Sequence, residues 1–502
     1  MEKQAEVITI NTDAGTTPQV TGSLIEGRKN VVSSLDNFYE AKVTIYVQAY
    51  NRLEKTKACI ESILKYTGDI DYELFLVDNG STDETLAYFK EVPYPKKRIL
   101  HITKNVGAMF PNLLLSIYQL APFAVFLGND IIVTSGWLSN LIRGMEEDKR
   151  IGMVCPVSSN VSNFQQINLP FSNLEEMQQQ AAVFNRPDTS KWQERLRLVT
   201  PATVYRMECL MAVGLPLADV GFFHDFADDD IAFRVRRAGY KAMLAGDTWI
   251  HHNHDLSHGE GKDPEQFRQS LSIGRNNFME KYQGVDAWDD VNNFWIDVLD
   301  DLPPTGGDGQ KRILGVDTRC GTPILDVKNR LRSMGFRNTE LSAFTEESKY
   351  QADLNTVCDG VVACDREEFF GRQYPTGYFD YVVVDKPLNR FHEPQFILDE
   401  AVRLLKPDGI LLFTLLNTFS FREYLFCRGD HRYYNPQFAY NIPIDILQKT
   451  VYTFGKILFT KSRMHNIDGA SQEYLLSTLP DRNALPLLLV DTYVMGVQKT
   501  GN

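Results

Sequence analysis

Residues 226–254 read FADDDIAFRVRRAGYKAMLAGDTWIHHNH, so an acidic helix start precedes a histidine-rich strand end. Asp228, Asp229 and Asp230 open a predicted helix whose apolar positions recur at helical spacing until Gly239 ends it. The helix dipole favours negative charge at this end, yet three adjacent acids exceed what capping needs. The sequence therefore indicates a general base at the start of this helix.

A histidine cluster follows a short predicted strand at 248–250. Four of the nine histidines of the chain fall within eight positions: His251, His252, His254 and His258. The strand would deliver them to one end of a sheet. The competing interpretation of residues 226–254 is a solvent-exposed acidic helix cap followed by a polar loop without a functional role.

Composition limits the classes of protein. The 502 residues are enough for two or three domains, and a net charge of −13 argues against binding to nucleic acid or to anionic membranes. The seven cysteines form no C-x-x-C pair, and no run is apolar and long enough to span a membrane. We expect reduced thiols and a cytoplasmic location.

Strand and helix patterns alternate after a polar extension at 1–40, which holds one short strand at 7–10. Strands are predicted at 43–49, 73–77, 98–102 and 124–127, and helices at 53–65, 83–90, 108–119 and 136–145. This order predicts a parallel sheet covered by helices on both faces. Ligands of such sheets bind beyond the carboxyl ends of the strands, where the polar residues of this chain fall.

Five motifs, found in order over residues 41–260, resemble the inverting family-2 glycosyltransferases of the GT-A fold. They are Ala49 to Arg52, Val77 to Asp83, the set of Asn105, Gly107 and Asn112, Gly128 to Asp130, and residues 226–254. The resemblance implies a GT-A domain at 41–290 that binds a UDP-, dTDP- or GDP-sugar.

The donor site is implied by the same resemblance. Asp78 would accept a hydrogen bond from the nucleotide base, backbone at Ala49 and Tyr50 would line the base pocket, and Arg52 would approach the pyrophosphate. Asn105, Gly107 and Asn129 complete the implied nucleotide-sugar-binding set. The run from Asp78 to Asp83 also fits a plain strand-to-helix turn capped by Ser or Thr.

The metal motif of that family, usually D-x-D, has only one acid here. It reads Gly128-Asn129-Asp130, so Asp130 is the expected ligand. The resemblance aligns a histidine ligand with His252, and His251 is the alternative. A site with imidazole and one carboxylate favours Mn²⁺ over Mg²⁺. A histidine loop that only hydrogen-bonds the acidic helix remains the competing interpretation.

The family pattern E-D-D-D-L-x-x-R-x-R-R-A-G-Y aligns with residues 227–240, where Ala227 stands in place of the Glu. The alignment implies that Asp228 is the catalytic base. A carboxylate there would deprotonate the acceptor hydroxyl. Asp229 is the alternative base, whereas Asp230 has Arg234 at i+4 and is better placed for an ion pair. The polar segment 158–200 would shape the acceptor site.

A second α/β domain is predicted at 311–502, after a linker at 291–310 rich in Pro and Gly. It resembles class I methyltransferases in the runs 379–385, 403–409 and 491–498. Strands are predicted at 312–317, 381–385, 410–416 and 491–498, and helices at 324–334 and 394–405.

The cofactor loop of this second domain departs from the family pattern D-x-G-C-G-T-G. Arg319 and Pro323 replace two glycines whose bare backbone lets S-adenosylmethionine approach. The acid expected to hold the ribose falls near Phe344. Binding of S-adenosylmethionine is therefore doubtful, and a degenerate domain kept for assembly or acceptor docking is the competing interpretation. The implied cofactor cleft would comprise Asp317, Gly321, Asp365 and Asp385.

The sequence as a whole predicts a metal-dependent inverting glycosyltransferase with a methyltransferase-like domain behind it. The acceptor would be a hydroxyl on a glycan or protein, such as a surface polysaccharide, a surface-layer protein or a flagellar subunit. Two alternatives stay open: a bifunctional enzyme that also methylates the glycan, and a nucleotide-sugar-binding scaffold without activity.

Overall fold

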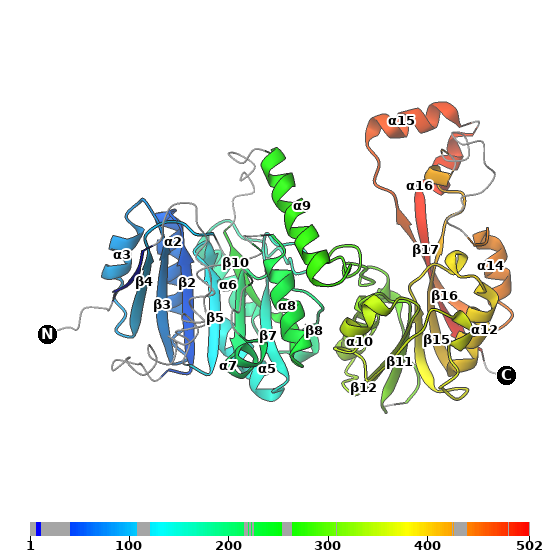
Figure 1. Cartoon of the computed structure of the whole chain (residues 1–502), viewed down its shortest axis with the longest axis horizontal. Coiled ribbons are helices and arrows are strands. Elements are labelled where there is room, and N and C mark those ends of the chain that lie inside the picture. Colours follow the sequence, from blue (N-terminus) through cyan, green and yellow to red (C-terminus); the bar gives the residue numbers. More distant parts are fainter. Residues whose placement is uncertain are drawn as a thin grey trace. The chain divides into compact units, whose positions relative to one another are not determined.

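The computed structural model describes residues 7–11, 41–107, 121–214, 219, 222, 225–253, 264–307, 309–423, 425, 439–479 and 481–500. The chain divides into two compact units, Met1–Asn292 and Asn293–Asn502. Each unit consists of one sheet with helices, so the predicted α/β class is confirmed (Figure 1). The domain limits at 41–290 and 311–502 stay predictions, as does the linker at 291–310.

The first unit is built on a mixed sheet with strand order β1-β4-β3-β2-β5-β9-β7-β10-β6, and β8 pairs with β10. β1 to β5 pair in parallel, as predicted, whereas β9 runs antiparallel to both β5 and β7. The strands are β1 (Val7–Ile10), β2 (Val43–Ala49), β3 (Tyr72–Asn79), β4 (Lys97–Ile102), β5 (Phe123–Gly128), β6 (Ile131–Ile132), β7 (Ile151–Ser158), β8 (Trp192–Glu194), β9 (Ala202–Arg206) and β10 (Lys241–His252).

Helices cover both faces of this sheet because its central strands are apolar on both sides. Val43, Ile45 and Val47 of β2 belong to one core cluster with α2 and α5, whereas Tyr46 belongs to the other, with α6 and α8. The helices are α2 (Leu53–Tyr66), α3 (Thr85–Glu91), α5 (Trp137–Glu147), α6 (Leu174–Phe184), α7 (Met207–Val213), α8 (Ala227–Arg237) and α9 (Pro264–Lys281). The helix predicted at 108–119 lies outside the described residues.

Strand β10 is far longer than the strand predicted at 248–250. It starts at Lys241 and pairs in parallel with β7, with irregularities between Ala245 and Trp249. The run Ala-Met-Leu-Ala-Gly has little strand propensity of its own, so pairing with neighbouring strands decides its conformation. The long strand connects helix α8 to the histidines at its far end.

The second unit has strand order β13-β12-β11-β14-β15-β17-β16. β17 is antiparallel to β15 and β16, and the remaining pairs are parallel. The strands are β11 (Lys311–Val316), β12 (Thr339–Thr345), β13 (Gly360–Ala363), β14 (Phe379–Val384), β15 (Leu405–Leu416), β16 (Gly455–Met464) and β17 (Val490–Lys499). The helices are α10 (Thr322–Ser333), α11 (Gln351–Leu354), α12 (Pro394–Leu404), α14 (Ile444–Val451), α15 (Gly469–Thr478) and α16 (Leu485–Leu489).

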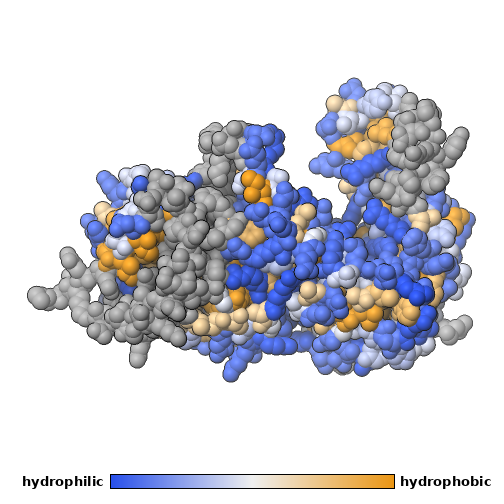
Figure 2. Space-filling view, viewed as in Figure 1, coloured by the Kyte–Doolittle hydropathy of each residue, from blue (hydrophilic) through white to orange (hydrophobic). Residues whose placement is uncertain are grey.

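Polar side chains dominate the coloured part of the surface, with smaller hydrophobic patches between them (Figure 2). Within the described ranges, no helix combines the length and apolarity that crossing a bilayer requires. The apolar side chains gather instead in the cores on either side of each sheet.

Candidate functional site

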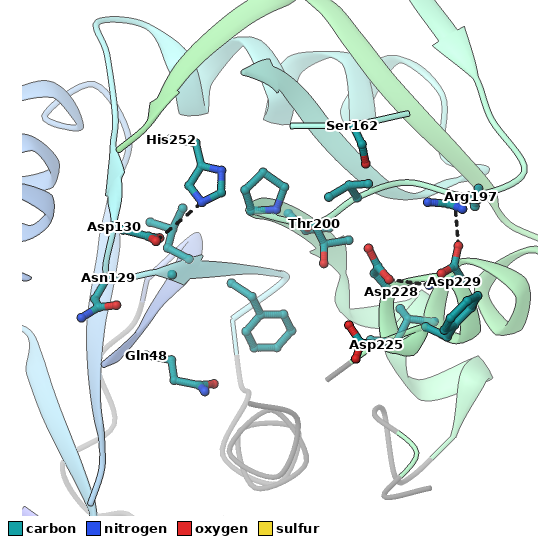
Figure 3. Close-up of a pocket in the computed structure, with 18 of the residues that line it drawn as sticks. Gln48, Asn129, Asp130, Ser162, Arg197, Thr200, Asp225, Asp228, Asp229 and His252 are labelled. Atoms are coloured by element: carbon teal, nitrogen blue, oxygen red, sulfur yellow. Dashed lines mark hydrogen bonds and ion pairs between the residues drawn. The ribbon is translucent and has the colours of Figure 1, made fainter. Parts of the chain in front are cut away.

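A pocket of about 730 Å³ opens in the first unit at the carboxyl ends of β2 and β5. Figure 3 shows Asp130 and His252 on one side of this pocket and Asp228 and Asp229 on the other. The two sides are called the metal end and the acid end below. They bring together residues from the turn after β5, from β10 and from α8, which are distant in the sequence.

The turn after β2 is held in an unusual backbone conformation beside the metal end. Asn51 and Arg52 are consecutive non-glycine residues in the left-handed region, with φ of 56° and 63°, a conformation that costs free energy unless neighbours stabilise it. The backbone N–H of Asn51 donates to Ser81 Oγ at 2.9 Å, and its side-chain Oδ1 accepts from the Thr82 N–H at 2.8 Å. Asn129 Nδ2 donates to the Asn51 carbonyl at 3.0 Å.

These contacts place several predicted donor-site residues at the pocket. Tyr50, 45% exposed, and Arg52 both line it. Ala49 is fully buried at the end of β2. Asn129 lines the pocket as well, but its amide also holds the Asn51 turn, a role that the sequence did not reveal.

Asp78 lies at the end of β3, and its carboxylate is fully buried. One oxygen accepts from the backbone N–H of Ser81 at 3.0 Å, and the other lies 2.7 Å from Nδ1 of His101. Both oxygens therefore have partners inside the protein. The role of Asp78 in binding a base stays a prediction.

Asn105 and Gly107 form a loop that packs on the end of β3. Asn79 Nδ2 donates to the Gly107 carbonyl at 2.9 Å and to Asn105 Oδ1 at 3.2 Å. At Gly80, with φ of 76°, a Cβ atom would lie 2.3 Å from the backbone N of Asn105, so only glycine fits there. The structure thus gives these residues a packing role, and their part in donor binding stays a prediction. Asn112 lies outside the described residues.

Asp130 and His252 meet because β6 pairs antiparallel with the end of β10. Nε2 of His252 lies 3.6 Å from Oδ2 of Asp130. Nδ1 of His252 lies 3.1 Å from the Asn160 carbonyl, and it can contact that oxygen only as a donor. In the neutral imidazole, Nε2 then carries the lone pair and faces a carboxylate oxygen, so two acceptors point toward one another. An imidazole nitrogen and a carboxylate oxygen are both metal-ligating atoms, so the two residues fit a metal site.

His251, the alternative ligand, points elsewhere. Its Nδ1 lies 2.8 Å from Ser159 Oγ, and its ring packs on Trp249 and Phe171. Burial lowers the pKa of His251, and the neighbouring His252 adds to this effect. His254 and His258 lie outside the described residues. Among the residues that the structure describes, no three His, Cys, Asp or Glu side chains gather as a ligand set.

The three acids of α8 have different surroundings. Phe226 caps the helix with φ of 66°, and Asp228 is the only one of the three that is partly exposed. Asp228 lines the pocket, and its Oδ1 accepts from the Asp229 backbone N–H at 3.1 Å. Of the three carboxylates, Asp228 therefore offers the most accessible oxygen to a bound substrate.

Asp229 is buried against Arg197, whose Nε lies 2.7 Å from Asp229 Oδ1 (Figure 3). Burial raises the pKa of Asp229 to about 8, the charge of Arg197 opposes this rise, and Asp228 adds to it. Arg197 comes from the polar segment 158–200, together with Ser162, Val199 and Thr200 of the pocket wall. The sequence offered no signal for Arg197.

Asp230 points away from the pocket into a buried network. Tyr282 donates to Asp230 Oδ1 at 2.6 Å, and Lys281 Nζ lies 2.6 Å from the same oxygen. Arg234 Nη1 lies 3.9 Å from Oδ2, so the predicted pair is confirmed, although it is the weaker contact. Burial raises the pKa of Tyr282, and the nearby Asp230 raises it further.

The loop after β11 in the second unit is also strained. Asp317 and Arg319 have φ of 46° and 52°, and Gly321 has φ of 106°. Pro323 lies in the first turn of α10, where proline is tolerated. Arg319 therefore adopts a glycine-like conformation, at the cost of strain, and adds a long side chain to the loop.

Glu346 is the acid that lies beside the position near Phe344 where the sequence predicts the ribose acid, and its role stays a prediction. Glu346 follows β12 directly, and its carboxylate forms an ion pair with Lys386. Its backbone N–H donates to Asp317 Oδ1 at 2.7 Å. Burial raises the pKa of Asp317 to about 7, and the charge of Glu346 raises it further. Burial also raises the pKa of Glu346, with Lys386 opposing.

Asp385, at the end of β14, has both carboxylate oxygens occupied. Trp295 Nε1 donates to Oδ1 at 2.8 Å, and Asn293 Nδ2 donates to Oδ2 at 2.8 Å. Asp365 is exposed after β13. The four predicted cleft residues thus follow the carboxyl ends of β11, β13 and β14, but two of them, Asp317 and Asp385, are held by internal partners.

Comparison with known proteins agrees with the division of the chain into two units, because a different family model matches within each. The family model described as Glycosyl transferase family 2 matches residues 44–195, and the model described as Methyltransferase domain matches residues 340–413. Two curated relatives, the ubiquinone biosynthesis O-methyltransferases of two Neisseria meningitidis strains, are 28% identical over 130 residues, or 26% of this chain. The chain spans about half the length of these relatives, 52%.

Similar solved structures are more distant. GalNAc-T7 with UDP, GalNAc and Mn²⁺ is 12% identical with a TM-score of 0.36, over 47% of this chain and 48% of that one. The mannosyltransferase PcManGT from Pyrobaculum calidifontis with GDP-Man and Mn²⁺ is 15% identical with a TM-score of 0.33, over 52% and 79%. TarS of S. aureus is 14% identical with a TM-score of 0.34, over 47% and 40%.

The assignment rests on the two family models and on the strand orders of the two sheets, and it confirms the expected resemblances. Residues 44–195 match the glycosyl transferase family 2 model, and residues 340–413 match the methyltransferase domain model.

Proposed function

We propose that the first unit transfers a sugar from a nucleotide-sugar donor to a hydroxyl acceptor, with inversion at the anomeric carbon. The observation that carries this proposal is one pocket with Asp130 and His252 at its metal end and Asp228 at its acid end. The match of residues 44–195 to the glycosyl transferase family 2 model supports it.

The metal end would bind the diphosphate of the donor. Asp130 and His252 would hold a divalent cation, Mn²⁺ in preference to Mg²⁺ because one ligand is an imidazole. When bound, such a cation neutralises the charge that develops on the leaving diphosphate. Asn160 fixes the His252 tautomer, so that Nε2 faces Asp130. Arg52, which also lines the pocket, would contact the diphosphate.

The acid end would activate the acceptor. Asp228 would take the proton of the acceptor hydroxyl while that oxygen attacks the anomeric carbon from the face opposite the leaving nucleotide. Asp229 is less suited to this role, because it is buried and paired with Arg197. Asp230 is buried beside Tyr282 and Lys281.

A screen of UDP-, dTDP- and GDP-sugars for Mn²⁺-dependent release of nucleotide tests this proposal. We expect slow hydrolysis of one donor, abolished by EDTA and by Asp130→Ala. Asp69→Ala, which changes an exposed turn residue of the same unit, is the matched control. Hydrolysis that persists in EDTA would remove the metal from the proposal.

A bifunctional enzyme is the second candidate, because the methyltransferase domain model matches and Glu346 stands at the end of β12. The residues do not fit the cofactor well: Lys386 already neutralises Glu346, and Arg319 occupies a glycine position. We therefore propose that the second unit binds S-adenosylmethionine weakly or not at all, and that it serves assembly or acceptor docking. The accessible Asp228 argues against a scaffold without activity.

We also propose a cytoplasmic location. No disulfide joins any two of the six cysteines in the described part of the chain, which suits a reducing compartment. Cys427 lies outside that part.

A further inference from the structure

The acid end of the pocket has an aromatic wall, defined here as Phe226 and Trp288, beside Leu271 of α9. The two ring centroids are 5.1 Å apart, with an interplanar angle of 35°. Phe226 immediately precedes α8, so the wall adjoins the helix turn that carries Asp228. The metal end presents mostly polar groups instead, including Arg52, Asn129 and Asp130.

The wall is built rigidly around Phe226. A bulky residue with φ of 66° is uncommon and must be stabilised by its neighbours. The Phe278 ring of α9 lies 6.3 Å from that of Phe226. At Gly274, a Cβ atom would lie 2.9 Å from both the Asp225 carbonyl and the Phe226 ring, so glycine allows α9 to approach this segment.

Trp288 contacts Arg275, which also lies on α9. The guanidinium of Arg275 lies 5.2 Å from the centre of the indole ring. Arg275 also pairs with Asp286 at 2.6 Å and with Asp289 at 2.9 Å. The backbone N–H of Trp288 donates to Asp286 Oδ1 at 2.8 Å. The indole therefore packs against both the guanidinium of Arg275 and the ring of Phe226.

Polar groups complete the acid end. Arg197, Ser162 and Thr200 line the pocket together with Asp228 (Figure 3). Nη1 of Arg197 is buried and has no hydrogen-bond partner among the described residues, so a donor group there is unsatisfied. An aromatic wall with a few polar groups matches the amphipathic surface of a pyranose ring, which has apolar C–H faces and a rim of hydroxyls.

We propose that the acid end binds a pyranose ring of the acceptor, so that the acceptor is a carbohydrate hydroxyl and not a protein side chain. This inference rests on the proposed function. The aromatic wall would contact the C–H groups of the ring, and Arg197 and Thr200 would hydrogen-bond its hydroxyls. One hydroxyl would then face Asp228.

The test measures nucleotide release from the donor found in the screen, with and without acceptor probes. The probes are methyl α- and β-pyranosides of common hexoses and N-acetylhexosamines, and a serine- and threonine-rich peptide. We expect at least one pyranoside to stimulate release and to appear as a glycosylated product, with no response to the peptide. In Trp288→Ala the ratio of stimulated to unstimulated release should fall about tenfold, whereas Trp288→Phe should retain most of it.

Phe267→Ala is the matched control, because Phe267 is an aromatic residue of α9, 47% exposed, that is not among the pocket residues. Stimulation by the peptide alone, or an unchanged ratio in Trp288→Ala, would overturn the inference. Donor hydrolysis without a response to any pyranoside would also overturn it, while leaving the proposed function intact. A wild-type protein that hydrolyses no donor would instead contradict the proposed function itself.

Discussion

Each unit carries acidic side chains that were predicted to bind a ligand, but these acids have different surroundings in the two units. In the first unit, Asp228 and Asp130 line a pocket of about 730 Å³. In the second, Glu346 is paired with Lys386, and Asp385 accepts hydrogen bonds from Asn293 and Trp295. An acid whose oxygens already have partners must lose them before it can bind a ligand, which costs free energy. Motif acids therefore have to be judged by their partners as well as by their position.

The largest expected effect concerns the accessible acid. Asp228→Asn keeps the volume of the side chain and its hydrogen bond to the Asp229 N–H but removes its basicity, so transfer should fall by about 10² to 10⁴. Donor binding, measured by calorimetry, should survive. Asp229→Asn is the comparison, because it changes the neighbouring buried acid. A collapse of transfer in that variant alone would move the base by one residue.

Asp130→Ala should weaken Mn²⁺-dependent binding of the donor by at least about tenfold, because it removes the carboxylate that faces His252. Calorimetry with and without Mn²⁺ measures this effect, and the circular dichroism spectrum checks the fold. Unchanged binding in the presence of Mn²⁺ would refute the metal assignment.

The corresponding test of the second unit is binding of S-adenosylmethionine by the full chain. We expect a Kd no tighter than about 1 mM, or about −4 kcal/mol, because Lys386 pairs with Glu346 and Arg319 occupies the loop. Calorimetry decides the point. A micromolar Kd would show that the acids of the second unit can bind a ligand despite their internal partners, as is proposed for the acids of the first unit.

Asp230→Asn should cost stability more than activity. It removes the charge that Lys281 and the hydroxyl of Tyr282 contact in a buried site, so unfolding should become easier by about 1 to 3 kcal/mol. Denaturant unfolding and the transfer rate are to be measured together. A variant with normal stability and no transfer would place Asp230 in the chemistry instead.

A further expected effect is on the pH dependence of stability. Asp229 and Asp317 have pKa values raised to about 8 and about 7 in the folded state, chiefly by burial. A carboxyl group whose pKa is higher in the folded state than in the unfolded state binds its proton more tightly when the protein is folded. The free energy of unfolding therefore falls as the pH rises from the unfolded-state pKa to the folded-state pKa. Asp229→Asn and Asp317→Asn should each flatten the fall in Tm between about pH 4 and pH 8. A Tm slope identical to that of the wild type would argue against the raised value.

Local patterns in the sequence predicted most of the helices and strands, because apolar periodicity is a property of neighbouring residues. They did not predict the full length of β10, since Lys241 to Asp247 become a strand through pairing with β7 and β8. The ribose acid could be placed only approximately, near Phe344, because strand ends are the least certain feature of such patterns.

The site depended even more on contacts between distant segments. Alternation along β10 puts His251 and His252 on opposite faces, so only one can face Asp130, and the register with β6 decides which. The sequence alone left both open. Arg197 could not be found at all, because it carries no motif and meets Asp229 only in the folded chain.

Strand β10 is the next secondary structure element after helix α8. The proposed base and the proposed histidine ligand therefore lie on one continuous segment of the sequence, residues 228–252. The donor half of the pocket is encoded separately, between β2 and β6. Recombination between related genes could therefore exchange both chemical groups in one event while keeping the donor preference of the host. A chimaera joined near residues 225 and 253 would place both junctions at the ends of secondary structure elements, but it would also exchange the core strand β10, so its apolar residues would have to pack against β7 of the host.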